Sequence, residues 1–240
     1  MRASDNITHW LLFALAATPV LGIAQENPVQ SRPPEIHVRV ISSLPGVHRA
    51  VPAVAWLTPE QGTSIPPFLP QAHYTLLQKN RTFSPHLQVI PVGSVVEFPN
   101  ADPFFHNVFS LFEGKRFDLG LYEAGSSKSV TFSREGVSYI FCNIHPEMSA
   151  VVLALSTPFY AIADTHDAFA LRGLPPGDYK LHLWVEGVPK SFLDGLTKSV
   201  HISSHDLDLG ALSAPIAQAK GMEHMNKFGS PYDTMSKPPY

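Results

Sequence analysis

The chain has 240 residues, of which 44% are hydrophobic and 15% are charged, and its formal net charge is −3. A chain of this length and hydrophobicity can bury one or two cores, so it is not disordered throughout. The low charge excludes the broad basic surface that nucleic acid or an anionic membrane would require. Proline supplies 23 residues, about twice the average share of roughly 5%, and proline interrupts helices. The composition therefore favours an all-β chain with no nucleic acid as a partner.

Residues 1–24 have the features of an export signal. Arg2 precedes an apolar run at residues 10–21, and small residues end the segment at Ala24. The run is shorter than the roughly 18 apolar residues of a transmembrane helix, and Pro19 interrupts it. We therefore expect cleavage after residue 24 and a bacterial periplasmic protein with no membrane contact. The weak positive charge before the run leaves an uncleaved anchor as the alternative.

Short segments of alternating hydrophobicity, bounded by turn residues, follow the signal and predict β-strands. The expected strands are residues 36–42, 53–57, 73–78, 86–92, 94–100, 106–112, 128–132, 137–142, 150–155 and 198–203. Residues 58–70 are expected to form a loop, and EGKRFDLGLYEAGSS, residues 113–127, a long connection. Strands at this spacing, with no sustained helical period, predict a sandwich or a barrel.

The single cysteine, Cys142, stands in YIFCNIHPEM, with His145 and Met148 following at steps of three residues. One cysteine cannot form an internal disulfide, so it is an inert thiol, a reactive thiol, an intermolecular bridge or a metal thiolate. Pro146 disfavours a helix at the residue before it. A compact loop after the strand at residues 137–142 could therefore turn all three side chains toward one point. Thiolate, imidazole and thioether together favour copper over magnesium, calcium or manganese.

A trigonal copper site with a long axial methionine needs a second imidazole, and His106 can supply it. This histidine begins a predicted strand upstream of Cys142. Three alternatives remain. Cys142 could be a buried thiol that behaves as a small hydrophobe. Zinc could bind, although methionine is a poor fourth ligand for it. Cys142 could also be a nucleophile with His145 as its base, although such a pair is usually oriented by a third group.

These residues resemble the cupredoxins, the small blue-copper proteins that include plastocyanin and amicyanin. The resemblance lies in SPHLQVIPVGSVVEFPN, in HNV and in the Cys-x2-His-x2-Met loop, whose short spacing is the amicyanin form. It covers residues 72–155, which look like the cupredoxin domain of bacterial proteins labelled methylamine-utilisation proteins. It implies a Greek-key cupredoxin β-sandwich with one type 1 copper ion, and a side chain of Asn107 that ties together the ligand-bearing strands. The equatorial and axial ligands that it implies are His106, Cys142, His145 and Met148.

The resemblance implies a carrier of single electrons between periplasmic redox partners. Phe141 and Asn143 flank Cys142, whereas multicopper oxidases and nitrite reductases have histidines there that lead to a second copper. We therefore expect no enzymatic activity, a transient protein redox partner and a monomer. The alternative is a periplasmic copper-binding or delivery protein without an obligatory redox partner. Thioether and imidazole donors in GMEHM, residues 221–225, motivate this alternative.

The remaining segments divide the chain further. Residues 25–71 form a lead-in with two β-strands, and residues 213–240 lose their periodicity and are expected to be a flexible tail. Residues 156–212, with an LPPGDY turn, resemble the carboxypeptidase regulatory-like family of small transthyretin-like β-sandwiches. Whether the strands at 36–42 and 53–57 complete that module or extend the cupredoxin sheet is left open by the sequence.

Overall fold

The computed structural model describes residues 34–42, 51–71, 73–111, 114–216 and 224–232. The chain divides into the units Met1–Arg32 and Pro33–Tyr240, and the described residues all belong to the second. The predicted export signal, residues 1–24, lies outside the described residues. Strands dominate those residues, and the helix among them, α1 (Lys190–Asp194), has five residues, so the all-β prediction is confirmed. Within the described ranges, no helix combines the length and hydrophobicity needed to cross a bilayer.

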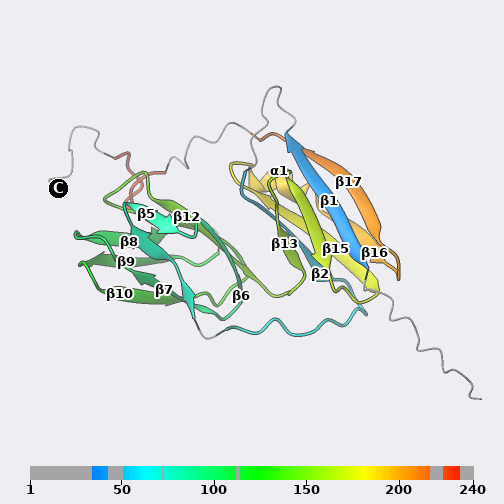
Figure 1. Cartoon of the computed structure of the whole chain (residues 1–240). Coiled ribbons are helices and arrows are strands. Elements are labelled where there is room, and N and C mark those ends of the chain that lie inside the picture. The colour runs from blue at the N-terminus through cyan, green and yellow to red at the C-terminus, as the bar shows by residue number, and fades with distance from the viewer. Residues whose placement is uncertain (1–33, 43–50, 72, 112–113, 217–223, 233–240) are drawn as a thin grey trace, which may run out of the picture. The chain divides into compact units, whose positions relative to one another are not determined.

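The strands between residues 74 and 155 form the first of two β-sandwiches, called here the first sandwich (Figure 1). One sheet has the order β6-β12-β11-β8-β9, and the facing sheet has the order β10-β7-β3, with β4 and β5 as a separate hairpin. The bounds are β3 (Tyr74–Thr75), β4 (Leu77–Lys79), β5 (Thr82–Ser84), β6 (Leu87–Pro91), β7 (Val95–Pro99), β8 (His106–Ser110), β9 (Phe117–Tyr122), β10 (Ser127–Thr131), β11 (Gly136–Cys142) and β12 (Ser149–Leu155).

The core of the first sandwich lies between its two main sheets. Val96 and Phe98 of β7 contribute from one sheet, and Val108, Ile140 and Val152 from the other. Cys142 and Met148 belong to the same cluster of buried residues. The end of this core is therefore where the predicted thiolate and thioether lie.

Strand β9 differs from the sequence-based expectation of a connection over residues 113–127. It pairs with β8 and is the last strand at that edge of the sheet. Its sequence, FDLGLY, alternates apolar with polar or small residues as a strand does, although only Tyr122 of its six residues is buried. Gly120, with a φ of 66°, accompanies a shift in register between Asn107 and Phe109. The glycines within and beside β9 favour a connection over a strand, because glycine weakens a strand interior.

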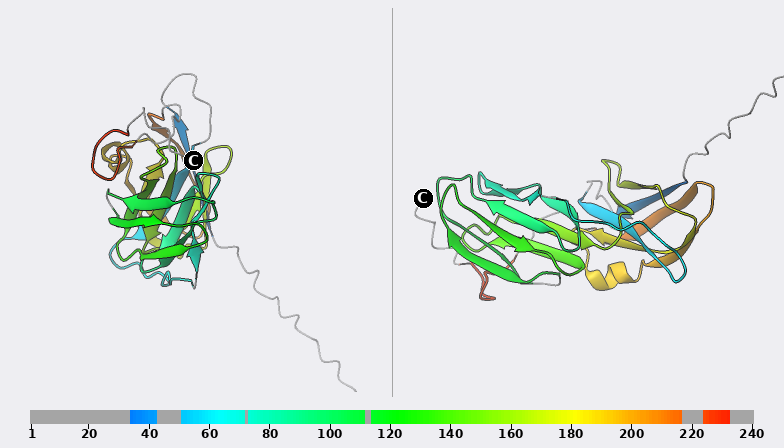
Figure 2. Two further views of the ribbon diagram at one scale, coloured as in Figure 1. Left: turned by 90° about the vertical axis from the view of Figure 1, so that its left-hand side faces the viewer. Right: turned by 90° about the horizontal axis from the view of Figure 1, so that it is seen from below.

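The second sandwich consists of the two early strands and the strands after residue 159. Its sheets have the orders β14-β1-β17 and β13-β2-β15-β16, so both early strands pair with strands of this group. Figure 1 shows β1, in blue, beside β17, in orange, and the right-hand view of Figure 2 shows the yellow coil of α1. The bounds are β1 (Glu35–Ser42), β2 (Ala53–Pro59), β13 (Tyr160–Ile162), β14 (Ala168–Arg172), β15 (Gly177–Val185), β16 (Lys198–Ile202) and β17 (Leu207–Ala214).

Candidate metal centre

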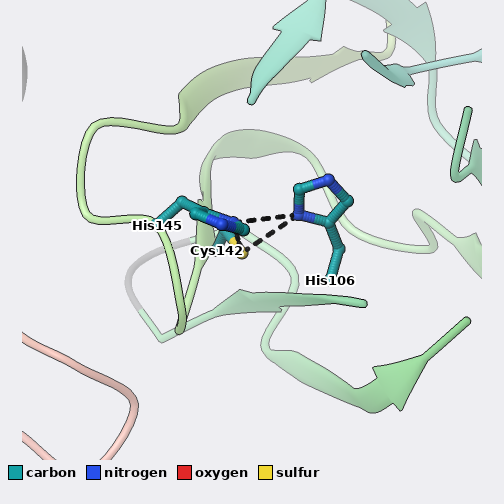
Figure 3. A group of neighbouring side chains, drawn as sticks. All are labelled: His106, Cys142 and His145. Atoms are coloured by element: carbon teal, nitrogen blue, oxygen red, sulfur yellow. Dashed lines mark hydrogen bonds between the residues drawn. The ribbon is translucent and has the colours of Figure 1, made fainter. Parts of the chain in front are cut away.

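Three side chains from separate places in the sequence converge at one end of the first sandwich (Figure 3). His106 is the first residue of β8, and Cys142 is the last residue of the neighbouring strand β11. His145 follows in the loop between β11 and β12. Among the described residues these three make up the group that could hold a metal ion. We call them the His–Cys–His cluster.

The donor atoms of the His–Cys–His cluster are close enough to share one ion. Sγ of Cys142 lies 3.6 Å from Nδ1 of His106 and 3.7 Å from Nδ1 of His145. The two Nδ1 atoms are 3.2 Å apart. Nitrogen and sulfur ligands at bond lengths of about 2.0–2.3 Å from one metal ion lie roughly 3–4 Å from each other. The separations therefore fit a common cation, and all three side chains are buried.

Met148, the predicted axial ligand, lies across the base of the same loop. Strands β11 and β12 pair with Phe141 opposite Ser149, and the N–H of Cys142 donates to the carbonyl of Met148 over 3.4 Å. The N–H of Met148 donates to the carbonyl of His145 over 3.0 Å. These two bonds close a compact loop, as the proline after His145 led us to expect. Met148 is 1% exposed, and its role as a ligand stays a prediction.

Burial affects the pKa values of Cys142 and His145. It raises the pKa of the Cys142 thiol, although the backbone N–H groups of Asn107, Ile144 and His145 act in the opposite direction. Burial, and then the neighbouring His106, lower the pKa of His145, so its imidazole is neutral and keeps a lone pair. A metal ion that binds here would displace the thiol proton, as metal sites with cysteine require.

Asp102 contacts His106 on the side of the ring away from Cys142, and no sequence pattern predicts this contact. Its Oδ2 lies 2.9 Å from Nε2 of His106. Burial alone would raise the pKa of Asp102, but the Arg81 amide, His106 and the Asn80 amide outweigh it and hold that pKa below its usual value. The available signal was an acidic residue in the turn before a histidine. That pattern does not show that the carboxylate faces the ring.

Asn107 and Phe104 also lie beside the cluster. The resemblance implied that the Asn107 side chain joins the two strands that carry ligands. Instead, it donates to Oδ1 of Asp118 over 2.7 Å and so joins β8 to β9. The Phe104 ring lies 5.3 Å from the ring of His106 and 5.4 Å from that of His145, measured between centroids. Phe104 therefore contacts both imidazoles and limits the access of water to them.

Residues 224–232, part of the predicted flexible tail, contact the strand and loop that carry Cys142. The His224 ring stacks on Phe141 at 3.9 Å between centroids, and the Tyr232 hydroxyl donates to the carbonyl of Cys142 over 3.0 Å. The N–H of Lys227 donates to Oδ1 of Asn143 over 2.8 Å. Contacts between residues so far apart in the chain leave no local pattern, so the sequence did not indicate them.

Comparison with known proteins finds copper proteins at low similarity. No family model matches the chain, and no curated protein matches it. A purple cupredoxin from Nitrosopumilus maritimus is 26% identical over 34% of this chain and 99% of that one, with a TM-score of 0.31. A copper(I) amicyanin variant is 17% identical over 35% and 82% of the two chains, with a TM-score of 0.33. A copper-containing nitrite reductase from Thermus scotoductus is 22% identical over 49% of this chain but 28% of that one, with a TM-score of 0.33. These TM-scores are low, and the geometry of the His–Cys–His cluster is the stronger indication of function.

Proposed function

We propose that the chain is a type 1 copper protein that carries single electrons. The observation that carries this proposal is the meeting of one sulfur and two Nδ1 atoms within 4.8 Å of one another, in a buried site. His106, Cys142 and His145 would be the equatorial ligands, and Met148 the axial one. A thiolate, two imidazoles and a thioether are the donors of blue-copper sites, and copper bound there supplies a reversible one-electron couple.

The residues around the cluster support electron transfer. The compact loop closed by the bonds of Met148 with Cys142 and His145 keeps the ligands in one arrangement, so a change of charge would require little movement. Burial of both histidines would keep water from a metal bound there. The flanking residues of Cys142, Phe141 and Asn143, provide no histidine link to a second copper. We therefore propose a carrier that works with a transient protein redox partner, and not an enzyme.

The optical spectrum of the copper-loaded protein tests this proposal. We expect an intense visible thiolate-to-copper charge-transfer band and a reversible one-electron couple. Cys142→Ser should abolish the band, because the hydroxyl does not replace the thiolate as a donor. His201→Gln, which changes an exposed histidine of the second sandwich, is the matched control and should keep both properties. A wild-type protein without the band, or without a reversible couple, would refute the proposal.

The copper-delivery alternative is tested by stoichiometry. His224 stacks on Phe141, and its Nδ1 lies 2.9 Å from the carbonyl of Met225, so this nitrogen donates to a backbone acceptor. Met222, the other thioether proposed for this site, lies outside the described residues. Removal of residues 217–240 should leave one copper per chain. The loss of a second copper equivalent in this variant would favour delivery over electron transfer.

Export to a bacterial periplasm is part of the same proposal. Its support is the sequence of residues 1–24, which lie outside the described residues. Cell fractionation and the mass of the mature protein test it. We expect the periplasmic form to begin at residue 25, and an intact N-terminus in the membrane fraction would instead support an anchor.

A further inference from the structure

Asp102 lies behind one imidazole of the His–Cys–His cluster. Its side chain is 5% exposed, and its Oδ2 lies 2.9 Å from Nε2 of the fully buried His106. An ionised carboxylate only accepts hydrogen bonds, so Nε2 of His106 carries the hydrogen. In the neutral imidazole, Nδ1 of His106 is then left with its lone pair. This is the nitrogen that lies 3.6 Å from Sγ of Cys142 and 3.2 Å from Nδ1 of His145.

Asp102 is itself fixed by three hydrogen bonds. Its Oδ1 accepts the N–H of Asn80 over 2.6 Å, and its Oδ2 accepts the N–H of Arg81 over 3.0 Å. Its own N–H donates to Oδ1 of Asn100 over 3.0 Å. Asn80 and Arg81 both have a φ of 55° in the turn between β4 and β5, as the type I′ form of a two-residue hairpin turn requires. The carboxylate is therefore held in place before any metal binds.

The second imidazole of the cluster has no such support. Nε2 of His145 is buried and has no hydrogen-bond partner. The two histidines thus differ in what lies behind them, although both direct Nδ1 at the same point. A carboxylate behind a ligand histidine fixes its tautomer and ring orientation and makes it a stronger donor. That effect can act here on His106 alone.

We infer that Asp102 is a positioning residue of the proposed copper site, with two effects on the metal. It holds His106 with Nδ1 toward the cation, and its negative charge, acting through the hydrogen bond, favours Cu(II) over Cu(I). The second effect rests on the proposed function, whereas the orientation of His106 does not. A weaker hydrogen bond at this position should therefore lower the affinity for Cu(II) and raise the reduction potential.

The tautomer of His106 in the copper-free wild-type protein is the first test. Correlation NMR of the imidazole nitrogens distinguishes a hydrogen on Nε2 from one on Nδ1. We expect the Nε2–H form for His106. The Nδ1–H form would overturn the inference. This measurement uses no copper and no variant, so it gives an answer even if the chain proves not to be a copper protein.

Asp102→Asn is the second test, because it removes the charge and keeps the shape. We expect Cu(II) affinity to fall by roughly ten- to a hundredfold and the reduction potential to rise, while the thiolate band remains. Asp164→Asn is the matched control. Its carboxylate also accepts two backbone N–H groups, from His166 and Ala168, but it lies in the second sandwich. Affinity and potential that are equal in the two variants would overturn the inference. If Asp102→Asn does not fold, the tautomer of the wild type decides.

Discussion

The four predicted ligands are all buried, and this burial has a consequence for each donor atom. His106 and Cys142 are fully buried, and His145 and Met148 are each 1% exposed. A polar nitrogen removed from water destabilises the fold unless it has a partner. The two Nδ1 atoms lie 3.2 Å apart, so one hydrogen can join them, but the thiol of Cys142 lies beside both. A shared cation would satisfy both nitrogens and the thiolate, so these residues fit metal binding better than core packing alone.

Met148→Leu separates the axial donor from the packing that the side chain provides. Leucine has a similar volume, so we expect the free energy of unfolding to fall by less than about 1.5 kcal/mol. The visible band should remain, because the thiolate is unchanged. The reduction potential should rise, because the lost thioether donates electron density that stabilises Cu(II) more than Cu(I). Voltammetry of the copper-loaded protein measures the shift.

Leu153→Met is the matched control for the axial methionine. Leu153 is also fully buried on a strand of the first sandwich, but it belongs to a different cluster from Cys142 and Met148. The reverse exchange at this position should leave the potential unchanged. A potential that does not move in Met148→Leu would show that the sulfur of Met148 does not act on the metal.

At the scale of elements, sequence patterns predicted most strands and the ligand loop, but not what lies beside them. The loop was predictable because Cys142, His145 and Met148 are close in sequence and Pro146 restricts the backbone between them. Strand β9 was missed because the glycines within and beside it favour a loop, although its apolar residues alternate. The contacts of residues 224–232 and of Asp102 depend on the folded arrangement, which local patterns do not encode.

Removal of one hydroxyl group tests the contact of residues 224–232 with β11. Tyr232→Phe removes the hydrogen bond to the carbonyl of Cys142, and the free energy of unfolding should fall by about 0.5–1.5 kcal/mol. Because that carbonyl belongs to the last residue of β11, hydrogen exchange should become faster at the amides of residues 143–145 and 147. Exchange measured by NMR or mass spectrometry would detect the change.

Tyr179→Phe controls for the loss of a similar bond elsewhere. The Tyr179 hydroxyl donates to the carbonyl of Pro175 over 2.9 Å within the second sandwich. We expect a similar loss of stability, with no local change at residues 143–147. Equal hydrogen exchange at residues 143–147 in both variants would mean that residues 224–232 do not restrain this loop.

At the scale of the whole molecule, the unit of residues 33–240 is held together by contacts that join its two sandwiches. The Trp184 indole N–H donates to the Tyr139 hydroxyl over 3.2 Å. A cluster of buried residues also includes members of both, among them Val54 and Leu153. The sequence could not show this, because it left open even where the two early strands pair. Those pairings join residues more than a hundred positions apart, and only the folded chain brings them together.

An ion pair between the sandwiches should make stability depend on pH. Nε2 of His86 lies 2.7 Å from Oε1 of Glu186, and Nδ1 lies 3.1 Å from the carbonyl of Ser149. Only the protonated imidazole donates to both acceptors, and the bond to Glu186 raises the pKa of His86 above its model-compound value of 6.5. The folded pKa therefore exceeds the unfolded one. The contribution of the pair is complete below about pH 6.5 and is lost as the pH rises through the folded pKa.

Glu186→Gln should remove this part of the pH dependence. The free energy of unfolding, measured by urea denaturation between about pH 5.5 and 8.5, should fall less with rising pH in the variant than in the wild type. Other groups that titrate in this window contribute equally to both proteins, so the difference between the two slopes reports the pair. Glu123→Gln, which removes the same charge from an exposed residue of the first sandwich, should keep the wild-type slope. The free energy of unfolding could instead have the same slope against pH in Glu186→Gln and in the wild type. His86 would then have the same pKa in the folded and unfolded states, and the pair would not stabilise the contact between the sandwiches.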